Sequence, residues 1–110
     1  MRRILALSIR QPYCEQILRG IKKAEYRSLP TNIRGQVYVY AALRPGHPDG
    51  FRKLKVQPGD LPTGVVVGVV EIVGCSGKPG DYAWHLANPK RLKRAIPPKN
   101  HPQPAWFYPF

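Results

Sequence analysis

The stretch from Ser8 to Ser28, SIRQPYCEQILRGIKKAEYRS, predicts the end of one strand, a short helix and the start of a second strand. Pro12 has no N–H to lose, so it suits the first turn of a helix, which we place over residues 12–19. An apolar stripe recurs at helical spacing, formed by Tyr13, Cys14, Ile17 and Leu18. Gly20 follows, where helices commonly end in a left-handed turn.

Polar side chains gather around this expected helix. Glu25 and Arg27 are two residues apart on the second strand, so they share one of its faces. Convergent polar groups beside an apolar helix are what a binding cleft needs. The candidate binding residues are Ser8, Gln11, Lys22, Lys23, Glu25 and Arg27, together with Trp84, whose indole could stack on a base.

Several of these residues also have an ordinary structural interpretation. Glu25 and Arg27 could form a structural ion pair, since a buried carboxylate needs a partner. Lys22 could sit in a solvated basic turn, and Trp84 could belong to the core. As a functional group, Lys22 suits phosphate anchoring better than catalysis, because a catalytic lysine needs a lowered pKa. Glu25 would oppose that lowering.

Charge separates this chain from an average protein. Eighteen Lys and Arg residues stand against six Asp and Glu in 110 residues, which gives a formal net charge of +12. Such an excess repels itself, and a polyanion relieves the repulsion. We therefore expect RNA or another nucleic acid as the partner. A merely soluble basic protein is the alternative. No long amphipathic helix is visible, so we expect no membrane partner.

The cysteines and histidines predict neither a disulfide framework nor a metal site. Cys14 and Cys75 lie among apolar neighbours outside any Cys-x-x-Cys pair, which predicts buried free thiols in a reducing cytoplasm. His47, His85 and His101 have no carboxylate or cysteine at ligand spacing, so we expect no metal and no cofactor.

The rest of the chain predicts further strands. We expect strands over 4–9, 24–27, 35–42, 82–86 and 91–96, and a β-prone run over 62–74 in which Gly68 forms a bulge. Residues 43–59 read as a surface excursion with at most one helical turn over 51–54, and residues 74–80 as a turn. The aromatic residues of the tail, 101–110, are expected to plug a barrel end.

About five or six short strands with one or two capping helices predict a mostly β, α+β fold, a small barrel. The absence of a separable linker predicts a single domain over 1–110. We expect this domain to be a monomer.

The chain resembles an ASCH domain, a PUA-like family named after activating signal cointegrator homology. Two motifs carry the resemblance: Leu7-Ser8-Ile9-Arg10-Gln11-Pro12-Tyr13, and Gly20-Ile21-Lys22-Lys23-Ala24-Glu25-Tyr26-Arg27, which matches the family pattern G-x-K-x-x-E-x-R. Residues 68–74 and 82–86 look like later strands of the family. The resemblance implies a PUA-like barrel with a cleft beside the first helix, and RNA or nucleotide-related ligands.

The same resemblance implies an enzyme as the alternative. Family members include ribonucleases and, in one branch, amidohydrolases that act on a modified nucleoside such as N4-acetylcytidine. That branch uses a lysine and a threonine, and this chain has Lys22 at the first position but Glu25 at the second. If the chain is an enzyme, Lys22 and Glu25 are its candidate catalytic residues. An adaptor that binds protein through the aromatic tail is a third class. The leading hypothesis is an RNA-binding module that uses the cleft from Lys22 to Arg27.

Overall fold

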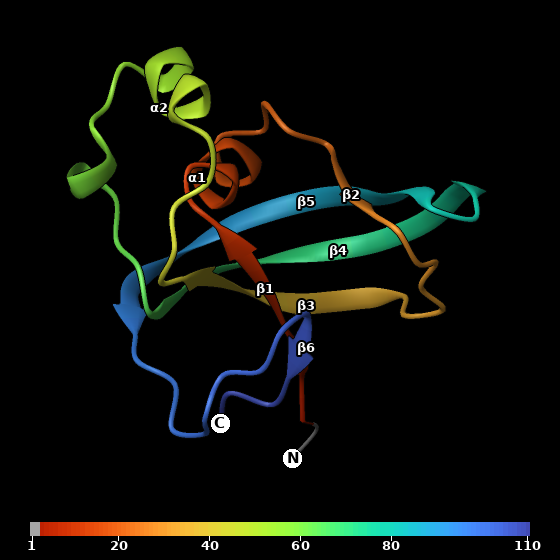
Figure 1. Cartoon of the computed structure of the whole chain (residues 1–110). Coiled ribbons are helices and arrows are strands. Elements are labelled where there is room, and N and C mark those ends of the chain that lie inside the picture. The colour runs from red at the N-terminus through yellow and green to blue at the C-terminus, as the bar shows by residue number, and fades with distance from the viewer. Residues whose placement is uncertain (1–2) are drawn as a thin grey trace.

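The computed structural model describes residues 3–110, and six strands in them form one curled sheet. The strands are β1 (Ala6–Arg10), β2 (Ala24–Arg27), β3 (Gly35–Ala42), β4 (Val65–Lys78), β5 (Asp81–Ile96) and β6 (Trp106–Phe107). Two helices, α1 (Tyr13–Leu18) and α2 (Pro48–Leu54), and the short 3-10 turn η1 (Pro58–Asp60) lie between them. The sheet order is β2-β5-β4-β3-β1-β6 (Figure 1). The predicted α+β fold, a small barrel, is confirmed, and the structure shows that the barrel is partly open.

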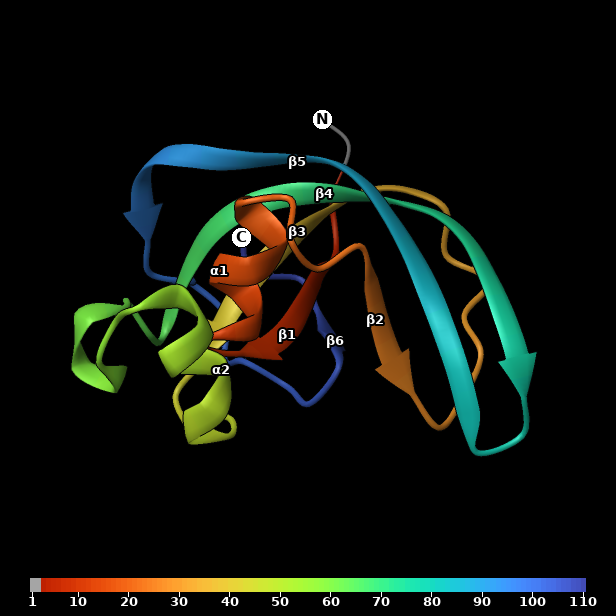
Figure 2. The same cartoon turned by 90° about the horizontal axis from the view of Figure 1, so that it is seen from above.

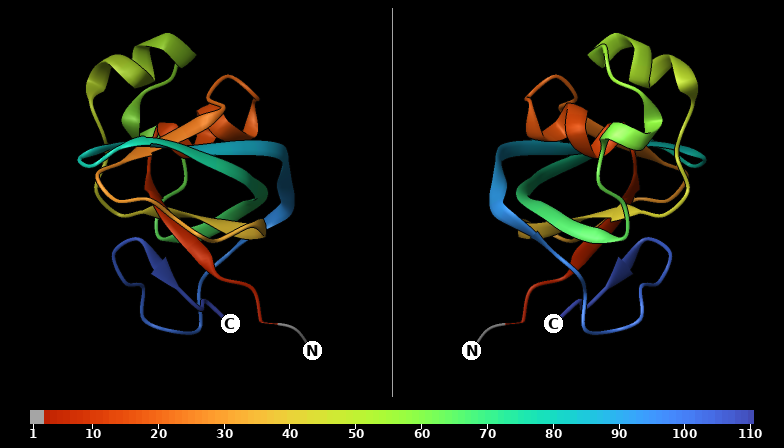
Figure 3. Two further views of the ribbon diagram at one scale, coloured as in Figure 1. Left: turned by 90° about the vertical axis from the view of Figure 1, so that its right-hand side faces the viewer. Right: turned by 90° about the vertical axis from the view of Figure 1, so that its left-hand side faces the viewer.

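The sheet is mostly antiparallel, and its connectivity places the helices. β1 pairs in parallel with β3, and all other neighbours pair antiparallel. The parallel pair requires a crossover, which contains α1 and β2. α1 packs against β1, β3 and β5, on the concave side of the curved β4–β5 hairpin (Figure 2). Both helices lie at one end of the molecule, and β6 with the C-terminal tail lies at the other (Figure 3).

Three local expectations were wrong. Residues 81–96 form one continuous strand in place of two, because register shifts absorb Asn88, whose φ is 51°. β4 extends to Lys78, so the expected turn over 74–80 is much shorter. The excursion contains the longer helix α2, which His47 caps by accepting a hydrogen bond from the Asp49 N–H at 3.2 Å.

Gly68 confirms the expected bulge and explains how closely α1 approaches the sheet. The register between β4 and β5 shifts between Val66 and Gly68. A Cβ atom on Gly68 would lie 2.5 Å from Leu18 Cδ2 and 2.7 Å from the carbonyl oxygen of Lys90. Only a glycine therefore lets α1 and β5 come this close at once.

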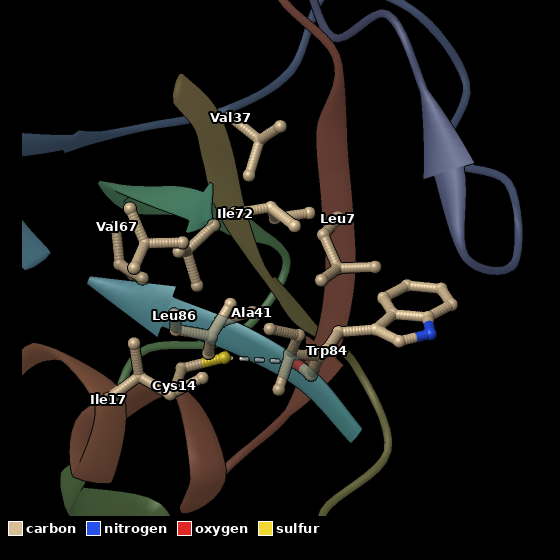
Figure 4. Close-up of a cluster of buried hydrophobic side chains, with 12 residues drawn as sticks. Leu7, Cys14, Ile17, Val37, Ala41, Val67, Ile72, Trp84 and Leu86 are labelled. Carbon is tan, nitrogen blue, oxygen red and sulfur yellow. Dashed lines mark hydrogen bonds between the residues drawn. The ribbon is translucent and has the colours of Figure 1, made fainter. Parts of the chain in front are cut away.

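The core lies between α1 and the curled sheet (Figure 4). The predicted stripe is confirmed, since Cys14 and Ile17 are fully buried while Tyr13 and Leu18 pack at the margin. The Cys14 thiol donates to the Ile9 carbonyl at 2.9 Å, and burial raises the pKa of this thiol. The expected burial was wrong for Cys75, which is only partly buried because it lies near the open end of the hairpin.

The tail aromatics pack as expected against the barrel. Trp106 stacks on Trp84 with ring centroids 5.7 Å apart and planes 10° apart. Phe107 meets Tyr40 edge to face at 5.1 Å. This packing holds the tail against the sheet, since aromatic pairs stabilise a contact beyond the effect of burying their apolar surface. None of the helices within residues 3–110 is both long enough and apolar enough to cross a membrane.

Candidate functional site

The curled sheet does not close between β1 and β2, and one arginine spans the gap. β2 pairs only with β5, and β6 pairs with β1 only at Ala6 and Leu7. Beyond those two residues, the Ser8 N–H donates to the Ala105 carbonyl at 2.8 Å. The Ser8 carbonyl accepts from Arg27 Nη2 at 2.9 Å. A side chain of β2 therefore replaces the backbone pairing that would have closed the barrel.

A pocket of about 830 Å³ opens at this gap. Four segments of the chain line it: the end of β1 with the start of α1, the turn into β2 with β2 itself, the end of β3 with the residues after it, and part of the C-terminal tail. The lining residues are 8–10, Tyr13, Lys22, 25–27, Tyr40, 42–44 and 101–105. A concave site with converging polar groups is the usual form of a ligand-binding pocket.

The charges around the pocket are unequal. Four cationic side chains line it, Arg10, Lys22, Arg27 and Arg44, and Glu25 is the one carboxylate among its described lining residues. Glu25 Oε2 accepts from Arg27 Nη2 at 2.6 Å and from Arg27 Nε at 3.0 Å. Glu25 Oε1 lies 3.3 Å from Lys22 Nζ. Glu25 is therefore a buried counterion that orients two of the cations.

The path from α1 to β2 aims Lys22 at the pocket. Gly20 ends the helix in the left-handed region, with φ 78°. The amides of Ile21 and Lys22 then both donate to the Gln16 carbonyl, at 2.9 and 3.1 Å, which fixes the turn. Lys22 Nζ lies 4.9 Å from the ring centroid of Tyr26. The predicted glycine stop thus places an ammonium group between a carboxylate and an aromatic face.

The structure brings together four of the seven candidate binding residues. Ser8, Lys22, Glu25 and Arg27 line the pocket. Lys23 does not; it lines a separate hollow of about 260 Å³, which Lys22 also reaches.

Gln11 and Trp84 lie outside the pocket and have structural contacts. Gln11 is 1% exposed; its amide donates to the Pro62 carbonyl at 2.9 Å and accepts from the Glu15 N–H at 3.2 Å. Trp84 is 4% exposed and donates to the Leu29 carbonyl. Its ring centroid lies 5.6 Å from the Arg27 guanidinium carbon, so Trp84 supports Arg27 from inside.

Sequence reasoning missed Arg44 and the tail segment 101–105, which line the pocket from positions far along the chain. No local pattern marks them, because their position depends on how the sheet curls. Arg10 lies within the stretch from Ser8 to Ser28 and could have been predicted, because it follows Ser8 by two residues on β1. The two residues share a face of that strand.

A second buried carboxylate has a structural role away from the pocket. Glu15 accepts from Arg91 Nη1 and Nη2 at 2.8 and 2.9 Å, and from Arg19 Nε at 2.8 Å. The hydrogen bonds from Arg91, with a further contribution from Arg19, lower the pKa of Glu15. The cluster fastens α1 to β5. Among residues 3–110, no group of His, Cys, Asp and Glu side chains is arranged to hold a metal ion.

Comparisons with known proteins agree with the motifs. Residues 7–96 match the ASCH domain family. Human (Homo sapiens) and mouse (Mus musculus) activating signal cointegrator 1 are each 30% identical to the chain over 80 residues. Each alignment covers 63% of this chain and 14% of the relative, so the chain spans only a small part of these proteins. The family match extends over both motifs and five of the six strands, and the chain belongs to the ASCH domain family.

Proposed function

We propose that the chain is an RNA-binding module whose pocket holds backbone phosphate with Lys22 and Arg27. The observation that carries the proposal is the gathering of four cations around one pocket with a single carboxylate. Membership of the ASCH family supports nucleic-acid binding as the general class. The net charge of +12 supports the same class, because cationic proteins bind nucleic acid by releasing its counterions.

The hydrogen bonds of Arg27 leave part of its fork available. Nε and Nη2 donate to Glu25, and Nη2 also donates to Ser8. Arg27 Nη1 has no protein acceptor among residues 3–110, so this nitrogen is the one that would donate to a phosphate oxygen. Lys22 is held by the same carboxylate. Because both cations are ordered before binding, a phosphate would lose less free energy in ordering them.

Tyr26 gives the pocket a surface on which a base can stack. Its side chain is 66% exposed at the rim, although it lies on β2 beside buried Glu25. Stacking on an aromatic ring suits single-stranded RNA, whose bases are not enclosed in a duplex. A single strand therefore fits the combination of cations and an open ring better than a duplex does.

Fluorescence anisotropy with a labelled single-stranded RNA of about ten nucleotides tests the proposal. We expect Lys22→Ala to weaken binding about tenfold, because one charge-assisted phosphate contact is lost. Lys78→Ala is the matched control, since Lys78 is exposed at the far end of the hairpin and does not line the pocket. Equal affinities for the two variants, both folded by circular dichroism, would overturn the proposal.

The same samples distinguish a binding module from an enzyme. Each protein is incubated with the RNA and with N4-acetylcytidine, and products are separated by chromatography. A module binds without turnover. Turnover by the wild type that Lys22→Ala abolishes would instead identify an enzyme that depends on Lys22.

A further inference from the structure

Residues 101–105, the C-terminal arch, form one wall of the pocket although they lie outside the family match, which ends at residue 96. Hydrogen bonds hold both ends of the arch. Before it, the amides of Lys99 and Asn100 donate to the Pro109 carbonyl at 2.7 and 3.1 Å. At its last residue, the Ala105 carbonyl accepts from the Ser8 N–H, and directly after it β6 pairs with β1. The arch is thus tied to β1, whose end also lines the pocket.

The arch is also stiff in its middle. Gln103 lies between Pro102 and Pro104, whose rings fix their own φ angles and restrict the residue before each of them. The stack of Trp106 on Trp84 anchors the chain directly after the arch. A polar group presented by such a segment loses little conformational entropy when it binds a ligand.

The arch adds a kind of side chain that the charged groups of the pocket do not provide. The four cations offer only hydrogen-bond donors, and the Glu25 oxygens are already occupied by two of those cations. The edge of a nucleobase presents donors and acceptors side by side. Gln103 contributes an amide, which offers both in one plane, and it is the one amide side chain among the described residues that line the pocket.

We propose that Gln103 determines specificity by hydrogen-bonding the edge of a nucleobase whose phosphate is held by Lys22 and Arg27. The ligand class is then a nucleotide unit of a single strand, and bare phosphate or any polyanion is a poorer ligand. This inference rests on the proposed function. It adds a residue outside the family match that reads the base.

Calorimetric titration with the four ribonucleoside 5′-monophosphates and with ribose 5-phosphate, which has no base, tests the inference. We expect the wild type to bind at least one nucleotide about tenfold more tightly than the others, as one good amide–base contact allows. Gln103→Ala should bring the four nucleotide affinities within about twofold of one another and leave the affinity for ribose 5-phosphate unchanged, because stacking on Tyr26 does not require Gln103. Gln36→Ala is the matched control, because Gln36 is exposed on β3 outside the pocket.

Other outcomes overturn the inference and separate it from the proposed function. If Gln103→Ala discriminates among the nucleotides as the wild type does, or if the wild type prefers no nucleotide over the others, Gln103 does not read a base. If Gln103→Ala weakens ribose 5-phosphate binding as much as nucleotide binding, the arch serves phosphate alone. In these cases RNA binding by Lys22 still stands. A wild type that binds neither RNA nor nucleotides removes the proposed function itself.

Discussion

Two buried glutamates show how the same residue type serves two purposes in this chain. Glu15 and Glu25 are each held by two cations and are 6% and 8% exposed. Arg91 joins Glu15 of α1 to β5, so this cluster stabilises the fold. The cations of Glu25 face a pocket, so Glu25 orients groups that could contact a ligand. Position relative to the gap in the sheet separates the two roles.

Glu15 makes the stability of the protein depend on pH. Its folded-state pKa is lowered chiefly by the hydrogen bonds from Arg91, so its contribution is full above the ordinary carboxyl pKa. The contribution is lost as the pH falls through the folded-state pKa. We expect Glu15→Gln to lower the free energy of unfolding by about 1–3 kcal/mol at neutral pH. The difference from the wild type should shrink below about pH 4.

Urea unfolding from about pH 3 to pH 7 measures this difference, and Glu71→Gln is the control. Glu71 lies on β4, where its carboxylate accepts one long hydrogen bond, from Asn88 at 3.4 Å. A constant difference between Glu15→Gln and the wild type across this range would contradict the assignment of the effect to the Glu15 carboxylate.

At this scale the sequence predicts neighbours better than partners. The shared face of Glu25 and Arg27 followed from strand alternation, and the ion pair is present at 2.6 Å. The contact of Glu15 with Arg91 joins residues 76 positions apart, and no local pattern indicates it. The sequence predicts a ligand-binding role for Gln11, whereas its amide bonds the backbone at Glu15 and at distant Pro62.

Among the elements, the contact of α1 with the β4–β5 hairpin depends on a missing side chain. Gly68 lies where Leu18 of α1 and the Lys90 carbonyl of β5 approach the same strand. This contact sets the position of α1 and hence of the turn that carries Lys22. The site therefore depends on packing at a residue that does not line the pocket.

Gly68→Ala tests this packing. We expect a loss of about 1–2 kcal/mol in the free energy of unfolding, because the added Cβ forces a backbone or helix shift. Gly59→Ala is the control, since a Cβ there meets no atom within 4 Å and Gly59 has no left-handed φ. Chemical denaturation measures both variants. A Gly68→Ala protein as stable as the wild type would show that α1 can move away at no cost.

The elements were predictable where a local signal exists. Residues 35–42 and the run before Gly74 are strongly β-prone, and both are strands. α2 was underestimated because its cap is a histidine, which is an uncommon capping residue. The continuity of β5 through Asn88 and Pro89 comes from pairing with β4, which overrides the local turn signals of those residues.

For the whole molecule, the incomplete closure of the sheet creates the candidate site. The motif residues from Ser8 to Arg27 were predictable as one cluster, because the short helix α1 brings β2 back near β1. Arg44 and the C-terminal arch join that cluster only once the sheet has curled and the tail has docked through Trp106. These contacts between segments far apart in the chain could not be predicted from the sequence.

If Lys22 neutralises an RNA phosphate in this pocket, the salt dependence of binding measures that contact directly. The logarithm of the association constant for a single-stranded RNA is plotted against the logarithm of salt concentration, for the wild type, Lys22→Ala and Lys78→Ala. We expect a slope for Lys22→Ala that is shallower than that of the wild type by about 0.7, the contribution of one single-strand phosphate contact, and an unchanged slope for Lys78→Ala. Identical slopes for the wild type and Lys22→Ala would contradict this expectation.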